Sequence, residues 1–327
     1  MAVMVEPPEL NFGFCSRMPP CPALDVQRVS AAACAFLARS LEAPKLPDTV
    51  GAMPVVDGRH LSGVSETALL TLHQRATEAA RPDGVIDDPM AIALRDSIDY
   101  DYHHFGRTHQ ATALRALAFD NAAREFLTAH PRATVVALAE GLQTSFWRLD
   151  NGELNWLSVD LEPIVQLRRQ LLPPSERLRY CAQSALDYSW MDQVDDTNGV
   201  LITAEGLLQY FERETVFDLI GACANRFPGG QFVFDSIPWL LSVYSRRRGF
   251  RLSEFYTAPP MPFWFTANHY DQLMALPGVR AVHELPAPPG RGKILPKVIA
   301  LTYRVPALAS LRAPTNVVDF AGSRQSP

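Results

Sequence analysis

The sequence predicts an α/β protein with a mostly parallel sheet of seven strands that ends in an antiparallel C-terminal hairpin. Two observations predict this class. Apolar, β-branched segments alternate with segments of helical periodicity from residue 134 onward, which is the pattern of a parallel sheet covered by helices. The last two apolar segments are joined by the short run "PPGRGKIL", which leaves no room for a crossover helix, so we expect them to pair antiparallel.

Three helices are expected before the first strand, and together they form a helical cap region over residues 65–134. Residues 65–82 carry apolar side chains at helical spacing and stop at a proline. Residues 87–98 begin with an aspartate that can cap the helix and with a proline in the first turn. Residues 108–130 form the third helix, which ends before Pro131.

Strands and helices then alternate through the predicted core, residues 135–305. The five parallel strands are expected at 134–139, 155–160, 178–184, 199–206 and 229–237, with helices at 161–172 and 213–227. The two strands of the hairpin are expected at 281–288 and 297–306.

Three further segments flank or interrupt this core. An insertion around 238–275 is expected to cap a substrate, and residues 306–327 are expected to form a flexible tail. Residues 1–64 are a proline-rich N-terminal extension with one expected helix at 25–43.

Composition excludes several classes of protein. The chain has 327 residues and a net charge of −5, which argues against a nucleic-acid partner. No apolar run reaches the roughly 18 residues of a membrane span, and the N-terminus lacks the pattern of a secretory signal. Because the cysteines are widely spaced and form no CxxC pair, we expect no metal site and no disulfide framework, and a reducing cytoplasm fits best. These cysteines are Cys15, Cys21, Cys34, Cys181 and Cys223.

Carboxylates end three successive predicted strands. Asp160 follows Gly141 by 19 residues, which is the distance at which a carboxylate commonly accepts hydrogen bonds from a ribose diol. Asp187 follows the third strand, where it could meet an adenine amino group, and Glu205 follows the fourth, over the centre of the sheet. Each residue alone is explained equally well as a helix cap or a turn former, but three at one sheet edge are not.

This arrangement of strands is typical of S-adenosylmethionine-dependent methyltransferases. The runs "VDLEPIVQLRRQLLPPSERLRYCAQSALDYSWMD", "GVLITAEGLLQYF" and "RFPGGQFVFDSIP" resemble the leucine carboxyl methyltransferase family. They are most similar to its bacterial branch, which is described as O-methyltransferases of polyketide biosynthesis. The resemblance covers about residues 65 to 305, and "AEGLLQY" and "SALDYSW" are its most specific parts.

The resemblance implies a class I methyltransferase fold, which is Rossmann-like, and S-adenosylmethionine as cofactor. By position, Asp160 would hold the ribose, Leu186 and Asp187 would lie by the adenine, and Glu205 would lie beside the methionine moiety. Arg115 matches an arginine that grips the cofactor carboxylate, a role suited to the paired hydrogen bonds of a guanidinium. The full set implied for the cofactor is Arg115, Ala139, Gly141, Asp160, Leu161, Leu186, Asp187 and Glu205.

The loop after the first strand departs from the family. That loop commonly reads Gly-x-Gly-x-Asp-Thr-Arg, whereas residues 139–145 read "AEGLQTS". Ala139 therefore replaces a glycine, which permits positive φ or close backbone approach. Since S-adenosylmethionine has no pyrophosphate to wrap, Gly141 alone suffices if Ala139 keeps an ordinary β conformation. Weakened binding is the alternative.

The acceptor side is less defined. A carboxylate acceptor is already ionised and needs no base, whereas a hydroxyl acceptor benefits from one. Tyr210, His269 and His104 are the weak candidates for a catalytic group, although packing explains each of them as well. An apolar acceptor pocket could be walled by aromatic and apolar residues of the insertion, or these could be a lid packed on the sheet. They are Tyr256, Met261, Phe263 and Trp264.

The favoured function is S-adenosylmethionine-dependent O-methylation of a carboxylate or hydroxyl on a small, polyketide-type metabolite. One alternative is a protein C-terminal carboxyl methyltransferase, which would need a channel for a peptide end. Another is a non-catalytic binding protein that keeps the fold, as the glycine-poor loop would suggest. A nicotinamide-dependent dehydrogenase fits least, because it gains nothing from Asp187, Glu205 or the antiparallel strands.

Overall fold

The computed structural model describes residues 53–322, apart from 62, 64, 293, 294, 306, 307, 309 and 310. The helix expected at 25–43 lies outside these residues, as do Cys15, Cys21 and Cys34. The two cysteines within them, Cys181 and Cys223, are buried and unpaired.

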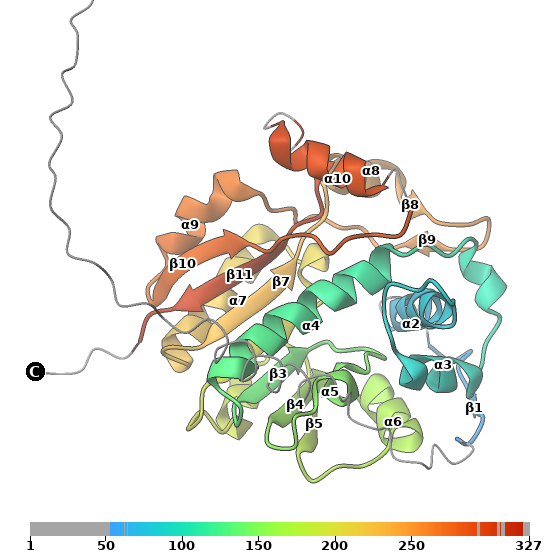
Figure 1. The fold of residues 1–327 in the computed structure, drawn as a ribbon, viewed down its shortest axis with the longest axis horizontal. Helices are drawn as coiled ribbons and strands as arrows, with labels where there is room; N and C mark the ends of the chain where they lie inside the picture. Colours follow the sequence, from blue (N-terminus) through green and yellow to red (C-terminus); the bar gives the residue numbers. More distant parts are fainter. Residues whose placement is uncertain are drawn as a thin grey trace, which may run out of the picture. The chain divides into compact units, whose positions relative to one another are not determined.

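The centre of the fold is a seven-stranded sheet with the order β10-β11-β7-β6-β3-β4-β5 (Figure 1). β11 pairs antiparallel with both of its neighbours, β7 and β10, and the other pairings in this sheet are parallel. The predicted class, a mostly parallel sheet with an antiparallel C-terminal pair, is therefore confirmed. The strands are β3 (Thr134–Leu138), β4 (Asn155–Asp160), β5 (Leu178–Ala182), β6 (Val200–Ala204), β7 (Gln231–Asp235), β10 (Val279–Glu284) and β11 (Thr315–Phe320).

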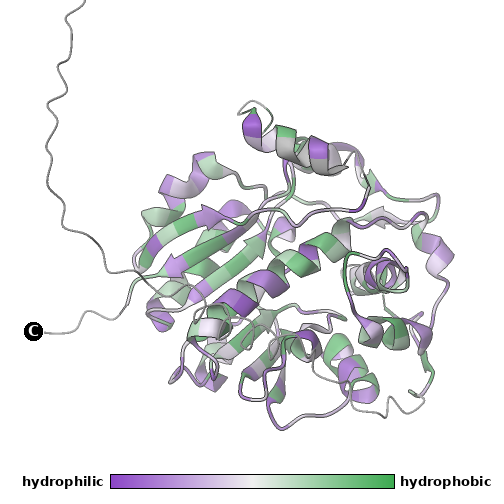
Figure 2. Cartoon of the chain, viewed as in Figure 1, coloured by the Kyte–Doolittle hydropathy of each residue, from purple (hydrophilic) through white to green (hydrophobic). Residues whose placement is uncertain are grey.

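Helices cover both faces of this sheet, so its strands are apolar on both sides, as Figure 2 shows for the central arrows. Alternate residues of a strand point to opposite faces. Val136 and Leu138 of β3 join a cluster that contains helix α7 (Arg213–Arg226), whereas Val135 and Ala137 join a cluster that contains helix α4 (Ala111–Ala129). The two clusters are the two layers of the core.

The remaining described helices surround the sheet, and two of them, with α4, make up the predicted helical block before β3. They are α2 (Glu66–Ala79), α3 (Pro89–Asp96), α5 (Ser145–Leu149), α6 (Glu162–Leu171), α8 (Trp239–Arg248), α9 (Tyr270–Met274) and α10 (Leu295–Arg304). Short 3-10 helices lie at Tyr102–Phe105, Tyr188–Gln193, Leu208–Tyr210 and Ala267–His269. Two small pairs of strands complete the described part, β1 (Val56–Asp57) with β2 (Ile98–Asp99) and β8 (Phe250–Arg251) with β9 (Thr257–Ala258).

The predicted start of α3 is confirmed in detail. The Asp88 side chain accepts a hydrogen bond from the backbone N–H of Ala91 at 2.9 Å, and Pro89 occupies the first helical position. The Asp88 side chain is also fully buried, which has consequences for the site below.

The prediction for the last strand is wrong. Residues 297–306 were expected as a strand, but they fall mostly within helix α10, and the strand beside β10 is β11 at Thr315–Phe320. An apolar run of about ten residues fits a helix as readily as a strand, and a proline near its start favours the helix. The expected flexible tail thus contains a buried strand that lies between β7 and β10.

Within the described part of the chain, no helix combines the length and the apolar character needed to cross a membrane.

Candidate active site

A cavity of about 410 Å³ lies at the carboxyl ends of β3, β4 and β6. Ligands of open α/β sheets bind at this edge, because the loops that follow parallel strands converge there. Its walls come from the loop after β3, the ends of β4 and β6, helices α2 and α4, and residues 241–261 of the insertion. The cavity therefore joins segments that lie almost 200 residues apart in the chain (261 − 65).

Asp160 presents a rigidly held carboxylate to this cavity. One oxygen, Oδ2, accepts the backbone N–H of Gly141 at 2.6 Å, and the other, Oδ1, accepts that of Leu161 at 2.7 Å. Burial raises the pKa of Asp160, and the two N–H groups act in the opposite direction. Since each carboxylate oxygen can accept more than one hydrogen bond, both can still accept hydroxyl groups from a ligand.

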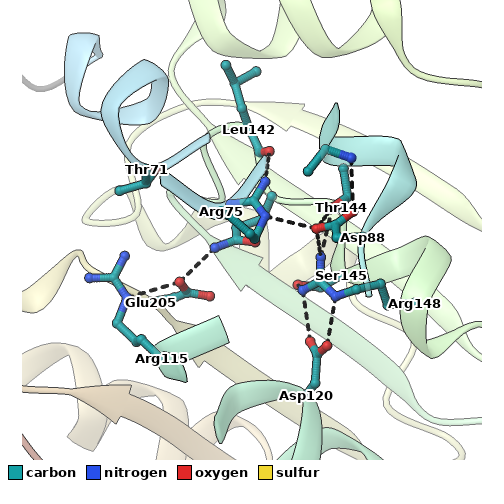
Figure 3. A network of polar contacts seen from close by, with 12 residues as sticks. Thr71, Arg75, Asp88, Arg115, Asp120, Leu142, Thr144, Ser145, Arg148 and Glu205 are labelled. Carbon is teal, nitrogen blue, oxygen red and sulfur yellow. Dashed lines mark hydrogen bonds and ion pairs between the residues drawn. The ribbon is translucent and has the colours of Figure 1, made fainter. Parts of the chain in front are cut away.

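Arg115 of α4 and Glu205 after β6 form a second polar group at the cavity (Figure 3). Arg115 donates from Nε to Glu205 Oε1 at 3.0 Å and from Nη1 to Asp235 Oδ2 at 3.5 Å. Gln143 donates to the same Glu205 oxygen at 2.7 Å. Among the described residues, Nη2 of Arg115 has no hydrogen-bond acceptor, so one edge of the guanidinium can bind an anionic ligand.

In this group one guanidinium, that of Arg115, pairs with two carboxylates, those of Glu205 and Asp235. Burial raises the pKa of Glu205, and the charge of Arg115 acts against that rise. Burial alone would lower the pKa of Arg115, but the negative charges of Asp235 and Glu205 raise it above its usual value. Arg115 is therefore a permanent cation at the wall of the cavity.

The loop after β3 does not adopt the conformation expected for it. Ala139 has a φ of +47°, and it is the one non-glycine residue with positive φ among those described. The condition under which Gly141 alone suffices, an ordinary β conformation at Ala139, is therefore not met, because the chain turns sharply between β3 and the cavity. Gly141 also has a positive φ, +60°, so both positions adopt a conformation that favours glycine.

Two buried arginines donate hydrogen bonds to the carbonyl groups of this loop. Arg75 of α2 donates to the Leu142 carbonyl at 2.6 Å. Arg168 of α6 donates to the carbonyls of Gly141 and Gln143 at 2.9 and 2.8 Å. Both side chains are fully buried. Neither arginine is among the site residues predicted from the sequence, although each lies on the apolar face of a predicted helix.

A buried network continues from Arg75 (Figure 3). Asp88 accepts hydrogen bonds from Arg75 at 2.9 Å, from Arg148 at 2.6 Å and from the Thr144 hydroxyl. Arg148 also makes a two-pronged pair with Asp120 at 2.7 and 3.0 Å. Burial alone would raise the pKa of Asp88, but the charges of Arg148 and Arg75 and the Thr144 hydrogen bond together lower it. The network ties the cap helices to the loop of the cavity.

The structure brings together most of the residues that the sequence predicts for the cofactor, but not those near the adenine. Leu186 and Asp187 do not line the cavity, whereas the preceding residues 183–185 do. The Asp187 side chain instead accepts the backbone N–H of Ser189 at 3.2 Å. The predicted residues that line the cavity are Arg115, Ala139, Gly141, Asp160, Leu161, Glu205, Tyr210 and Met261.

The aromatic residues expected to wall an acceptor pocket pack elsewhere. Tyr256 is buried against Phe105, and Phe263 lies in the core beneath β7. Trp264 packs edge-on against His269. None of the three lines the cavity, because Tyr256 and Phe263 are buried within the fold and the half-buried Trp264 packs on His269.

The two predicted histidines also lie away from the cavity. His269 accepts the backbone N–H of Thr266 in a local cap, and burial, with the charge of Arg213, lowers its pKa. His104 stacks on Phe255. His109 is the described histidine that lines the cavity, together with Gln74 and Gln209. Sequence reasoning missed His109, although it precedes Thr112 and Arg115 by three and six residues.

Comparisons with known proteins agree with this fold. The family model for leucine carboxyl methyltransferase matches residues 68–224. The chain is 32% identical over 262 residues to the tetracenomycin polyketide synthesis O-methyltransferase TcmP of Streptomyces glaucescens, a match that covers 69% of this chain and 96% of that protein. It is 30% identical over 211 residues to the S-adenosyl-L-methionine-dependent methyltransferase dpfgK of Gibberella zeae, covering 56% and 70%.

Two solved structures illustrate more distant likenesses. Human N-acetylserotonin methyltransferase in complex with S-adenosylmethionine is 14% identical, with a TM-score of 0.40 and coverage of 79% of this chain and 67% of that one. The plantazolicin methyltransferase BamL in complex with S-adenosylhomocysteine is 10% identical, with a TM-score of 0.46 and coverage of 80% and 98%.

The protein is an S-adenosylmethionine-dependent methyltransferase with the class I fold. The chain belongs to the leucine carboxyl methyltransferase family. The residues at the cavity fit the cofactor of this class, because a buried carboxylate with spare acceptor capacity suits a ribose diol and a guanidinium edge suits an amino-acid carboxylate.

Proposed function

We propose that this protein methylates an oxygen, a carboxylate or a hydroxyl, of a small polyketide-type metabolite. One observation carries the proposal: a single cavity extends from Asp160 and Gly141, past Arg115 and Glu205, to Met261 of the insertion. The methyl group of a cofactor and the reacting oxygen of an acceptor can thus meet in one cavity. The relationship to TcmP, whose name describes a polyketide O-methyltransferase, supports the choice of acceptor.

At the cofactor end, the proposed roles follow from the donors and acceptors on the wall. Asp160 accepts the ribose hydroxyls while the backbone of Gly141 and Leu161 holds its carboxylate in place. Arg115 binds the amino-acid carboxylate through Nη2, and Glu205 fixes the guanidinium at 3.0 Å. Leu161 lies against the ribose, and residues 183–185, which line the cavity where Leu186 and Asp187 do not, lie nearest the adenine.

When bound, the cofactor supplies a methyl group on a sulfonium sulfur. Its transfer to an acceptor oxygen would remove the positive charge on sulfur. The protein therefore needs to align the acceptor oxygen with the methyl and to exclude water, rather than to stabilise a new charge. Gln209, Tyr210 and Met261 line the part of the cavity that can do so.

A base is needed only for one acceptor class. A carboxylate is already ionised at neutral pH, whereas a hydroxyl gives up its proton during the transfer. Tyr210 and His109 line the cavity, so they are the candidates to receive it, and His104 and His269 do not.

The cofactor site is tested by calorimetric titration with S-adenosylmethionine and S-adenosylhomocysteine. We expect micromolar binding to the unmodified chain and a loss of about a hundredfold or more in Asp160→Ala, because that change removes a charged acceptor and two anchors of the loop. Asp192→Ala, at an exposed position, is the matched control and should bind as the unmodified chain does. If millimolar cofactor fails to bind the unmodified chain, the non-catalytic alternative replaces this proposal.

The acceptor class is tested by incubation with S-adenosylmethionine and three panels: aromatic carboxylates, phenols, and peptides with a free C-terminus. Mass spectrometry detects the added methyl group. Products from the first two panels support the proposal. Methylation of peptides alone would replace it with the protein carboxyl methyltransferase alternative.

A further inference from the structure

A second cavity, of about 450 Å³, lies on the other side of Arg115. Its walls come from α4, from the end of β7, and from residues 285–288, 302–303 and 311–315. Most of the lining side chains are small or cyclic, among them Ala111, Ala118, Pro286 and Pro288. Apolar cavities of several hundred cubic ångströms are the usual size for drug-sized ligands, and the roles proposed above leave this one unused.

The two cavities adjoin. Thr112, Arg115 and Gln209 line both of them. Gln209 is held by its backbone carbonyl, which accepts the N–H of Phe263 at 3.3 Å. Its side-chain amide has no hydrogen-bond partner among the described residues. The amide therefore lies at the boundary with both its donor and its acceptor unused.

The charged residues that line the second cavity are Arg115, Asp235 and Arg312. Arg115 and Asp235 pair with each other, and Arg312 lies outside that pair. It is fixed by an ion pair of 3.2 Å with Glu284, and its guanidinium lies 4.4 Å from the ring centre of Tyr303. The Tyr303 hydroxyl also donates to Glu284, at 2.9 Å. The Nε atom of Arg312 is buried and has no partner among the described residues. Arg312 lines the second cavity and its side chain is 16% exposed, so the accessible part of its guanidinium can bind an anionic oxygen there.

We propose that the second cavity binds the methyl acceptor, and that the acceptor is a flat, largely apolar aromatic molecule with a carboxylate that pairs with Arg312. This inference rests on the proposed function. Alanine and proline walls leave a smooth apolar space that suits stacked rings, and Arg312 anchors the far end of the molecule. The reacting oxygen then points past Gln209 into the first cavity, where the methyl group is transferred.

The probe for this proposal is 4-benzoylbenzoate, an aromatic carboxylate whose ketone inserts into nearby C–H bonds on irradiation. The full chain is saturated with S-adenosylhomocysteine, irradiated with the probe, digested and analysed by mass spectrometry. We expect the label on residues 285–288 or 311–315. Arg312→Gln should lower this labelling at least tenfold, because it removes a charge-assisted hydrogen bond.

Two further variants serve as controls. Arg304→Gln changes an exposed arginine of α10 and should be labelled as the unmodified chain is. Arg312→Lys keeps a positive charge beside Glu284 and should retain part of the labelling, which separates loss of binding from loss of folding. Label on residues 241–261, no label at all, or equal labelling of Arg312→Gln would each overturn the inference. Failure of S-adenosylhomocysteine to bind, measured calorimetrically on the same samples, would instead refute the proposed function.

Discussion

Ala139 combines two features that conflict locally. It follows a strand of five buried residues, and its backbone N–H pairs with the Val159 carbonyl at 2.7 Å, yet its φ is +47°. A left-handed conformation costs an L-residue with a side chain about 1–2 kcal/mol. The loop keeps this conformation because Arg75 and Arg168 hold the carbonyls that follow.

Ala139→Gly should therefore stabilise the protein. Relief of the left-handed alanine outweighs the added chain entropy of glycine, so we expect the free energy of unfolding to rise by about 0.5–1 kcal/mol. Urea denaturation measures this change. Ala137→Gly, two residues earlier in β3, is the control and should destabilise, because its φ is not positive and its side chain is buried. Equal losses in both variants would show that Ala139 is not strained.

The strand β11 decides how the C-terminal part of the chain is built. All six of its residues are buried, and it pairs with β7 on one side and β10 on the other. The preceding residues 305–314 read "VPALASLRAP", mostly small and apolar, so no change in local pattern marks the six residues of β11 as an interior strand. Without residues 315–320, the edge of the sheet beside β7 would therefore stay exposed to solvent.

Val318→Ala tests the place of this strand. Val318 is fully buried, so the truncation should lower the free energy of unfolding by about 2 kcal/mol through lost burial and a small cavity. Val305→Ala, at a residue 37% exposed after α10, should change it by less than about 0.5 kcal/mol. Similar small effects at both positions would mean that residues 315–320 behave as the flexible tail that the sequence predicts.

The buried network around Asp88 connects parts of the molecule that fold as separate elements. Asp88 caps α3, Arg75 comes from α2, Arg148 from α5, and Asp120 from α4. Through Arg75 and the Thr144 hydroxyl, the same network reaches the loop of the first cavity. We therefore expect the cap helices and the cofactor loop to lose structure together rather than independently.

Asp88→Asn should lower the free energy of unfolding by about 3–5 kcal/mol at pH 7, because it leaves Arg75 and Arg148 buried without their shared counter-charge. The pKa of Asp88 is lowered by folding from its usual 3.8. Its contribution to stability is therefore complete above that pH and is lost as the pH falls through the lower folded pKa. Denaturation over a range of pH should show the gap between unmodified and variant chains narrowing in acid.

Asp87→Asn is the matched control, since Asp87 is adjacent in sequence but exposed. We expect it to change stability by less than about 0.5 kcal/mol at any pH. A gap for Asp88→Asn that stays constant down to strongly acidic pH would contradict the assignment of the charge network as its cause.

Much of the fold and part of the candidate site follow from local pattern. The five parallel strands and the helices α2, α3, α4, α6 and α7 lie where alternation, periodicity and capping residues predict them. Asp160 and Glu205 line the cavity for the same reason, because the carboxyl ends of parallel strands meet at one sheet edge. Arg115 came from family resemblance rather than from any property of its helix.

Other features depend on contacts between distant residues, which no local pattern contains. Arg75 binds the carbonyl of Leu142, 67 residues away, and the positive φ of Ala139 is tolerated only in that setting. Residues 297–306 form a helix, and the buried place beside β7 belongs to β11. Aromatic side chains such as Phe263 and Trp264 are equally apolar in a pocket or in a core, and only the packing of the whole chain decides which surface they cover.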